Sequence, residues 1–370
     1  MASPRLFQHL KVGNVQLEHR VVMSPLTRYR ADKNHVPHDF VETYYKQRAS
    51  TPGTLIITEA TIIAPQAGGY DNVPGLYTKE QLDAWKKIVH SVHARNSFIF
   101  SQLWALGRTA DPSVLARNGF PHVAPSDIPL TGREVKPRPF TIDEIKEFVQ
   151  LHAKAASNAV NVAGFDGVEL HGANGYLIDQ FIQDVSNHRQ DEYGGSIENR
   201  ARFVLEVIDA VVKEVGENKV GIRLSPWRTF QDMRMQDPIP TFSYLVKEIA
   251  ARWPNFAYIH VIEPRFDYQG TEIPAGVVRL CSSNDFLRDI WGSRPYIAAA
   301  GFNRPLAIDT VEDKGGLVAF GRDFISNPDL PLRLKLDIPL TPWDVKTFYK
   351  AESRDGYIDY PFAEETGIAV

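Results

Sequence analysis

The sequence alternates between short apolar runs and longer stretches in which apolar residues recur every three or four positions. Short apolar runs bounded by polar or glycine positions are typical of buried strands, and the wider spacing is typical of amphipathic helices. The pattern predicts eight strands, at 21–23, 54–60, 98–104, the first half of 167–177, 220–226, 258–263, 296–301 and 316–321.

A predicted helix follows each strand, and three of these helices have a recognisable first residue. Thr78 with Gln81, and Thr141 with Glu144, have the spacing of a capping box, in which two side chains bind free N–H groups of the first helical turn. Ser196 is a third candidate cap. The predicted helices lie at 40–48, 78–92, 141–162, 196–216, 242–253, 284–291, 305–311 and 329–336.

Eight strands alternating with eight helices predict a parallel sheet, and eight repeats favour a closed (β/α)8 TIM barrel. A doubly wound open sheet is the alternative. It would require a glycine-rich turn after the first strand, and the sequence has Ser-Pro-Leu-Thr there, at 24–27. The periodicity fails at 107–140, where six prolines mark an irregular excursion. We expect residues 1–370 to form a single domain, with the excursion capping the barrel.

The composition excludes several classes of protein. Hydrophobic residues make up 43% of the 370-residue chain and charged residues 23%, which is ordinary for a globular protein. A formal net charge of −4 leaves no basic footprint, so nucleic acid is not expected as a partner. Cys281 is the only cysteine, which excludes an internal disulfide framework and an all-cysteine metal cluster.

Targeting signals are not evident. Residues 1–7 lack the apolar core of a signal peptide, and no apolar run approaches the length that spans a bilayer. The last four residues, 367–370, match no common targeting or prenylation signal. We therefore expect a cytoplasmic protein that does not bind membranes.

Three polar side chains, His171, Asn174 and Tyr176, follow the fourth predicted strand. They lie among glycines, which let the backbone turn tightly where the strand stops. An imidazole and an amide can both donate hydrogen bonds to one oxygen, and a phenol close by can give up a proton. The trio suits a carbonyl substrate that develops negative charge and is then protonated on carbon. Any one of them alone would more often be a structural hydrogen bonder.

The carboxyl ends of the strands, where the active sites of this fold lie, hold further candidates. The seventh strand ends at Gly301, and the eighth ends at Gly321 and Arg322. Backbone donors beside a guanidinium suit a phosphate group, and the last two loops of such barrels often bind one. The alternative is that both glycines only make turns at strand ends.

Flavin mononucleotide (FMN) is a phosphate compound that gives the other strand-end residues a role. Gln102 could pair with the flavin pyrimidine, Arg223 could lie beside the edge that becomes negative on reduction, and Thr27 could tune the redox potential. Gln102 could instead pair with a neighbouring strand end. Arg223 could instead satisfy Glu169 or Glu59. Carboxylates and histidines do not cluster in metal-ligand spacing, so no metal is expected.

Eight short stretches, spread over the chain from Leu6 to about Ala363, share the pattern of one family. They are Ser-Pro-Leu-Thr-Arg at 24–28, Tyr-Tyr-Lys-Gln-Arg-Ala at 44–49, Leu-Ile-Ile-Thr-Glu-Ala at 55–60, Gly-Gly-Tyr at 68–70, Gln-Leu-Trp at 102–104, His-Gly-Ala-Asn-Gly-Tyr-Leu at 171–177, Asp-Glu-Tyr-Gly-Gly-Ser-Ile-Glu-Asn-Arg at 191–200, and Gly-Arg at 321–322 followed by Phe-Ile-Ser-Asn-Pro-Asp-Leu at 324–330. Together they resemble the old yellow enzymes, which are flavin-dependent ene-reductases. Fungal members are most similar, including those of ergot-alkaloid pathways.

The resemblance implies bound FMN, with NADPH as reductant, and three catalytic residues. His171 and Asn174 would bind the substrate carbonyl, and Tyr176 would donate a proton. Some isomerising relatives have phenylalanine where Tyr176 stands, so Tyr176 favours net reduction. The implied flavin-binding residues are Pro25, Leu26, Thr27, Ala60, Gln102, His171, Arg223, Gly301, Gly321 and Arg322. The implied substrate-binding residues are His171, Asn174, Tyr349, Trp104 and Tyr70.

The resemblance predicts a ping-pong ene-reduction. NADPH reduces the flavin and leaves, an α,β-unsaturated aldehyde or ketone binds, hydride passes to its β-carbon, and Tyr176 protonates the α-carbon. Alternatives are a flavin-dependent isomerase or an alkaloid-type reductase of the same family, a non-catalytic flavin-binding barrel, and a flavin-free barrel enzyme acting on a phosphorylated sugar or ketoacid. We expect a monomer or a homodimer with a small-molecule substrate.

Overall fold

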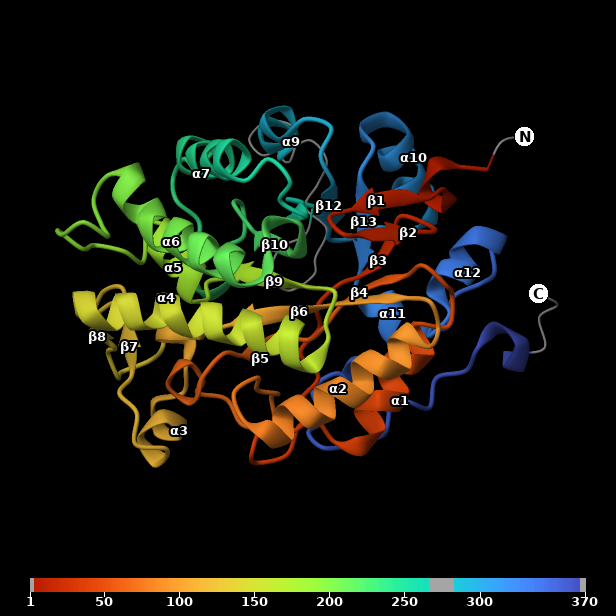
Figure 1. The fold of residues 1–370 in the computed structure, drawn as a ribbon, viewed down its shortest axis with the longest axis horizontal. Helices are drawn as coiled ribbons and strands as arrows, with labels where there is room; N and C mark the ends of the chain where they lie inside the picture. The colour runs from red at the N-terminus through yellow and green to blue at the C-terminus, as the bar shows by residue number, and fades with distance from the viewer. Residues whose placement is uncertain (1–2, 266–282, 367–370) are drawn as a thin grey trace.

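A computed structural model describes residues 3–265 and 283–366, and within them eight parallel strands form a closed barrel (Figure 1). Strand β13 pairs with β3, and β4 pairs with β6, which completes the ring. The predicted (β/α)8 TIM barrel is confirmed. The barrel strands are β3 (Val21–Met23), β4 (Leu55–Ile57), β6 (Phe98–Trp104), β9 (Gly167–Gly172), β10 (Val220–Leu224), β11 (Tyr258–Ile262), β12 (Tyr296–Ala299) and β13 (Leu317–Phe320).

All eight predicted helices are present, with bounds close to those expected. They are α1 (Asp39–Arg48), α2 (Lys79–His93), α4 (Ile142–Ser157), α6 (Ile197–Val215), α7 (Ile239–Arg252), α9 (Asp285–Trp291), α10 (Arg304–Lys314) and α12 (Leu330–Leu336). A π-helical segment, η4 (Asn158–Ala163), continues α4 to the end that the pattern predicted. One-turn 3-10 segments lie at Arg5–Phe7, Pro65–Ala67, Gly107–Thr109, Glu217–Lys219, Phe230–Asp232, Val345–Thr347 and Ala363–Thr366.

The three predicted caps are confirmed by their hydrogen bonds. Both predicted capping boxes form completely, at the start of α2 and at the start of α4. The Thr141 hydroxyl accepts a hydrogen bond from the Glu144 N–H at 3.2 Å, and the Glu144 carboxylate accepts one from the Thr141 N–H at 2.8 Å. The Ser196 hydroxyl accepts a hydrogen bond from the Asn199 N–H at the start of α6. Helix positions are therefore encoded locally.

The excursion at 107–140 is not wholly irregular, which corrects the prediction. It contains the helix α3 (Pro112–Arg117) and two paired strands, β7 (Val123–Ala124) and β8 (Arg138–Pro139). Asp111 caps α3, and Pro112 occupies the first helical position, where a missing N–H has no cost. Whether the excursion caps the barrel stays a prediction. Three other short elements were not predicted: β5 (Thr61–Ile62), α5 (Leu177–Ile182) and α11 (Arg322–Ser326).

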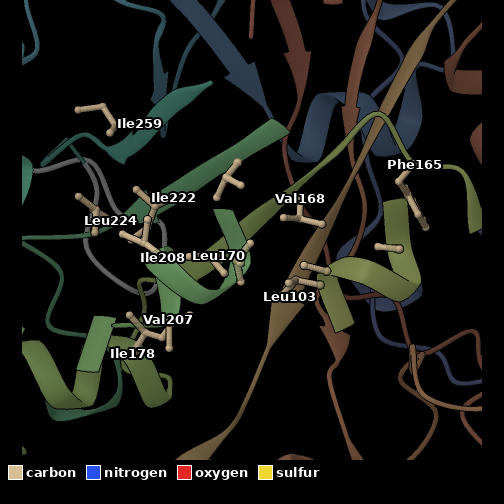
Figure 2. Packing of buried hydrophobic residues seen from close by; sticks show 14 of the residues in the cluster. Leu103, Phe165, Val168, Leu170, Ile178, Val207, Ile208, Ile222, Leu224 and Ile259 are labelled. Carbon is tan, nitrogen blue, oxygen red and sulfur yellow. The ribbon is translucent and has the colours of Figure 1, made fainter. Parts of the chain in front are cut away.

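Alternate residues of the barrel strands face opposite sides of the barrel wall. Val168 and Leu170 of β9 and Ile222 of β10 belong to the hydrophobic layer between barrel and helices (Figure 2). Glu169, which lies between Val168 and Leu170, and His171, which follows Leu170, therefore point into the barrel. Polar side chains in these strands are thus placed inside the barrel by the two-residue period of a strand.

A hairpin that the pattern did not predict closes the base of the barrel. Its strands are β1 (Leu10–Val12) and β2 (Val15–Leu17), drawn in red in Figure 1. The buried side chains Val12, Val15 and Leu17 pack against Leu55 and Leu317, which lie at the starts of their strands. The base of such a barrel is the end that serves stability rather than chemistry.

A C-terminal segment, 343–357, returns to the first loop of the barrel. Arg28 donates hydrogen bonds from Nε to the Phe348 carbonyl at 3.0 Å and from Nη2 to the Gly356 carbonyl at 2.8 Å. Arg30 donates to the Thr347 and Ser353 carbonyls, each at 2.9 Å. Both arginines are buried, so this segment is held against the C-terminal end of β3.

Some sequence-based expectations lie outside the described residues, among them those on Cys281 and on both termini. In the described ranges, no helix combines the length and the apolar character needed to cross a membrane.

Candidate active site

A cavity of about 710 Å3 opens at the C-terminal ends of the barrel strands. Its size is within the range of small-molecule and cofactor sites, roughly 300–1,000 Å3. The loop after β3, the strands β10, β11, β12 and β13 and the C-terminal segment all contribute to its wall. The predicted site residues that line it are Pro25, Leu26, Asn174, Arg223, Gly301, Gly321, Arg322 and Tyr349.

Positive charge dominates the lining of this cavity. Of the described residues, Arg223, Arg228 and Arg322 line it together with one acidic residue, Asp323. The Arg322 guanidinium lies 5.0 Å from the centre of the Trp343 ring, which also lines the cavity. An excess of guanidinium groups in a concave site favours an anionic ligand.

The cavity wall is bare backbone at the ends of β12 and β13. Gly301 has a φ of 66°, in the left-handed region where other residues are strained. At Gly321 a Cβ atom would approach the Leu26 side chain to 3.3 Å, which is tighter than ordinary contact. Exposed backbone at a strand end beside Arg322 is the arrangement that suits a phosphate.

Arg223 connects the cavity with a polar layer inside the barrel. It pairs in register with His171 on β9 and with His260 on β11. Burial lowers the pKa of Arg223 to about 10, although the Glu169 carboxylate opposes this shift. Its Nη2 donates a long hydrogen bond to the Ser24 hydroxyl at 3.4 Å, and its buried Nε has no partner in the described part of the chain. An orphaned buried donor is expected to meet a ligand or water.

His171, like Arg223, has a buried nitrogen atom without a hydrogen-bond partner in the described part of the chain. The ring is buried, and its Nδ1 finds no partner among residues 3–265 and 283–366. Burial, followed by the nearby charges of Arg223 and His260, holds the pKa of His171 well below its usual range. The imidazole is therefore neutral at pH 7 and can donate one hydrogen bond and accept another.

The loop after β9 holds Asn174 in a fixed, left-handed conformation. Its φ is 58°, which asparagine tolerates better than most residues. The Asn174 N–H donates to the Ser225 hydroxyl at 2.8 Å, and the next N–H, of Gly175, donates to the Asp179 carboxylate at 2.8 Å. Gln180 donates from Nε2 to the Gly175 carbonyl at 2.7 Å. Three hydrogen bonds thus fix a loop of four residues.

Tyr176 lies in an aromatic cluster beside His171. The centres of these two rings are 4.8 Å apart. The Trp104 ring packs edge-to-face against Tyr176, with 4.9 Å between the ring centres. Tyr70 contacts Trp104 in turn at 5.7 Å. Burial raises the pKa of Tyr176 well above its usual range, and a hydrogen bond with the Gln231 side chain offsets only part of this shift. The phenol is therefore fully protonated at neutral pH.

Tyr349 links this aromatic cluster with the cavity. It lines the cavity, its side chain is 67% exposed, and its ring lies 5.9 Å from the ring of Tyr29. Tyr29 and Tyr349 both raise the pKa of Tyr176, which places the three phenols near one another. Tyr349 therefore lies between the cavity and the other tyrosines of the cluster.

Seven predicted site residues do not line the cavity itself. Gln102 is buried and donates from Nε2 to the Glu169 carboxylate at 2.7 Å, so the simpler interpretation of Gln102 is observed. Glu169 also influences Arg223, as the simpler interpretation of that residue expected. The roles of all these residues stay predictions. The seven residues are Thr27, Ala60, Gln102, Trp104, His171, Tyr70 and Tyr176.

The structure adds residues that the sequence pattern did not single out. Asp179, Ser225 and Gln231 hold the loop and the phenol, and Trp343 and Phe348 complete the cavity wall. Asp179 lies two residues beyond the 171–177 motif, and this closeness in sequence is the local signal that could have indicated it. Nothing in the local pattern indicates the others, because their contacts come from distant parts of the chain. Among the described residues, no group of three His, Cys, Asp or Glu side chains could hold a metal ion.

Comparison with known proteins identifies the class. Residues 5–341 match the NADH:flavin oxidoreductase / NADH oxidase family, and the chain belongs to this family. It is a flavin oxidoreductase of the old yellow enzyme type, with FMN as cofactor and a nicotinamide as reductant. The resemblance inferred from the sequence is thereby confirmed.

Individual relatives are similar over almost their whole length. "Chanoclavine-I aldehyde reductase fgaOx3" of Penicillium roqueforti is 48% identical, with 99% of this chain and 98% of the relative covered. "Probable inactive dehydrogenase easA" of Claviceps fusiformis is 44% identical, with 99% and 96% covered. Among solved structures, Old Yellow Enzyme from Pichia sp. has a TM-score of 0.89 and 40% identity over 97% of this chain and 94% of that one. Morphinone reductase in complex with tetrahydroNAD has a TM-score of 0.88 and 39% identity over 99% and 100%.

The site residues fit an FMN molecule. The bare backbone at Gly321 and the guanidinium of Arg322 suit its phosphate, and the cavity is large enough for a cofactor. Two buried nitrogen atoms, Arg223 Nε and His171 Nδ1, lack partners within the described ranges. A polar ring system could supply both partners.

Proposed function

We propose that the protein is an FMN-dependent ene-reductase, which takes hydride from NADPH and reduces α,β-unsaturated aldehydes or ketones. One observation carries the proposal. A partly buried phenol, Tyr176, lies against a neutral imidazole, His171, on the strand and loop that also carry Asn174, which lines the cavity. These groups match the proton donor and the two carbonyl ligands of the reaction.

The residues proposed to hold the cofactor surround the cavity or lie directly beneath it. Bound FMN supplies the two-electron chemistry, because it can accept hydride from a nicotinamide and pass hydride to an alkene carbon. Arg322 would neutralise the phosphate, and Arg223 would neutralise the ring edge that gains negative charge. The proposed set is Pro25, Leu26, Thr27, Ala60, Gln102, His171, Arg223, Gly301, Gly321 and Arg322.

His171 and Asn174 are proposed to bind the substrate oxygen. As hydride reaches the β-carbon, negative charge moves to this oxygen, and donors already in place stabilise it. The neutral His171 ring can donate a hydrogen bond for this purpose, and the rigid loop holds the Asn174 backbone. Each well-placed donor of this kind is worth roughly 3 kcal/mol in the transition state.

Tyr176 is proposed to donate the proton to the α-carbon. A general acid must hold its proton until the transition state, and the raised pKa of Tyr176 ensures that it does at neutral pH. The Gln231 side chain, which forms a hydrogen bond with Tyr176, can stabilise the phenolate that remains. Tyr70, Trp104 and Tyr349 would shape the pocket around the alkene.

Two relatives favour an aldehyde substrate and NADPH. One is called a "Chanoclavine-I aldehyde reductase" and another, 46% identical, an "NADP-dependent oxidoreductase". An unsaturated aldehyde would place its oxygen between His171 and Asn174 with its chain toward the exposed Tyr349. An assembly state of monomer or homodimer stays a prediction.

A second candidate function is a flavin-binding barrel without net reduction, because several relatives bear the words "probable inactive". The two functions differ in one observation on the purified yellow protein under anaerobic conditions. A reductase is bleached by NADPH and regains its colour when cyclohexenone is added. An idle flavin carrier is not bleached, and an isomerase converts its substrate without net consumption of NADPH.

The variant Tyr176→Phe tests the proposed mechanism directly. It removes the acidic proton and keeps the ring, so alkene reduction should slow by about 100-fold or more, as expected for loss of a general acid. Flavin reduction by NADPH should change little. Stopped-flow measurement of both half-reactions separates these outcomes, and equal losses in the two would contradict the role given to Tyr176.

A further inference from the structure

We propose that Glu169 is a positioning residue that tunes the flavin: it fixes the orientation of the Gln102 amide and offsets the charge of Arg223. The consequence is that the midpoint potential of the flavin is lower than it would be if Arg223 acted without Glu169. This inference rests on the proposed function, because it takes Gln102 and Arg223 to face the pyrimidine half of FMN.

The Glu169 carboxylate is the centre of a hydrogen-bonded group inside the barrel. Its side chain is 0% exposed, and Oε1 accepts a hydrogen bond from Gln102 Nε2 at 2.7 Å. Oε2 accepts one from His260 Nδ1 at 2.9 Å. The three residues come from β6, β9 and β11, so the carboxylate ties together strands on both sides of β10.

The first bond determines which way the Gln102 amide faces. A carboxylate can only accept, so the NH2 group of Gln102 must turn toward Glu169. The amide oxygen must then face away, since turning it toward Oε1 would oppose two acceptors. Gln102 therefore offers an acceptor on its other side, and the pyrimidine of FMN carries an N–H that can meet it.

The second effect is electrostatic. Arg223 is partly buried, and Glu169 is the acidic group that most favours its charged form. His260 does not cancel the carboxylate, because burial lowers the pKa of His260 and leaves the ring neutral at pH 7. The negative charge of Glu169 thus remains inside the barrel. It weakens the attraction of Arg223 for a second negative charge on the reduced cofactor.

Two variants separate the two effects, measured on the FMN-loaded protein. Glu169→Gln removes the charge at almost constant volume, and dye-coupled titration should give a more positive midpoint potential. A tenfold shift toward the reduced form corresponds to about 30 mV for a two-electron couple. Glu169→Asp keeps the charge but shortens the side chain. Its midpoint potential should stay near that of the parent. The dissociation constant for FMN should rise about tenfold, because the contact with Gln102 is lost.

Asp166→Asn is the matched control, because it removes one carboxylate at the opposite end of the same strand. Asp166 precedes β9 and binds the Ile99 N–H at the base of the barrel, at 2.8 Å. This variant should leave the midpoint potential unchanged. An unchanged potential in Glu169→Gln with FMN bound would overturn the inference, as would a lowered one. A merely structural Glu169 would reduce the thermal midpoint only.

The proposed function can fail independently of this inference. The potential is measured with dyes and needs no alkene, so an inactive flavin barrel would still show the shift. Conversely, loss of the Tyr176 role in stopped-flow experiments would leave the Glu169 result standing.

Discussion

Asp179 shows how a single buried acid can control the residues that would do the chemistry. Its Oδ2 accepts the Gly175 N–H at 2.8 Å, and its Oδ1 accepts Gln183 Nε2 at 2.7 Å. It also forms a hydrogen bond with Ser225, whose hydroxyl accepts the Asn174 N–H. Burial raises the pKa of Asp179 to about 7, against these hydrogen bonds.

The raised pKa of Asp179 predicts a pH-dependent contribution to stability. Between about pH 4 and 7 the folded state keeps this proton, whereas an unfolded aspartate, with a pKa of about 3.9, has lost it. The contribution is therefore complete below about pH 4 and is lost as the pH rises to about 7. Asp179→Asn cannot ionise and lacks this dependence.

The measurement is the free energy of unfolding in urea for both proteins at several pH values. The stability of the parent relative to Asp179→Asn should fall across that window, by at most about 1.4 kcal/mol per pH unit, and stay level above it. Buried His19, whose pKa is lowered to about 4, has the opposite dependence but is common to both proteins. A difference independent of pH would show that Asp179 ionises normally.

At the residue scale, the sequence could predict candidates but not their connections. His171, Asn174 and Tyr176 follow directly from one motif at one strand end. Gln231 could not be found in this way, because it reaches Tyr176 from a loop after another strand. For Gln102 the sequence left open a pairing with an unspecified neighbouring strand end, and only the strand register brings Glu169 opposite it as the partner.

At the element scale, helices were predictable because their first residues carry the signal. Thr141→Ala removes the hydroxyl that caps α4 and should lower the free energy of unfolding by about 1 kcal/mol. Thr141→Ser keeps the hydroxyl, so its free energy of unfolding should lie within about 0.5 kcal/mol of that of the parent, the usual range for a surface substitution. Urea denaturation of the three proteins provides the comparison. Equal losses in both variants would mean that the methyl group, rather than the cap, matters.

Short elements escaped prediction because they carry too little pattern. The hairpin strands Leu10–Val12 and Val15–Leu17 have three residues each, which is too short for a reliable alternation. Helix α3 has six residues among many prolines, so its own proline looked like a breaker although it begins the helix. The barrel strands were recognised because both faces are buried and the runs are almost continuously apolar.

At the scale of the whole molecule, the two ends of the barrel have separate tasks. Leu17→Ala opens a cavity in the hairpin that closes the base and should lower the free energy of unfolding by about 3 kcal/mol. The flavin spectrum and FMN affinity should stay unchanged, because the site is at the other end. Leu336→Ala is the control, since that side chain is 48% exposed and should cost little. Weakened FMN binding in Leu17→Ala would show that the ends are coupled.

The C-terminal segment has a consequence for the order of assembly. Trp343, Phe348 and Tyr349 form one side of the cavity, and Arg28 and Arg30 hold this segment from the start of the barrel. During synthesis the arginines leave the ribosome more than 300 residues before their carbonyl partners. A nascent chain therefore lacks one wall of its own binding site until residues 343–349 have emerged from the ribosome, and the cofactor can be captured in its final position only after that point.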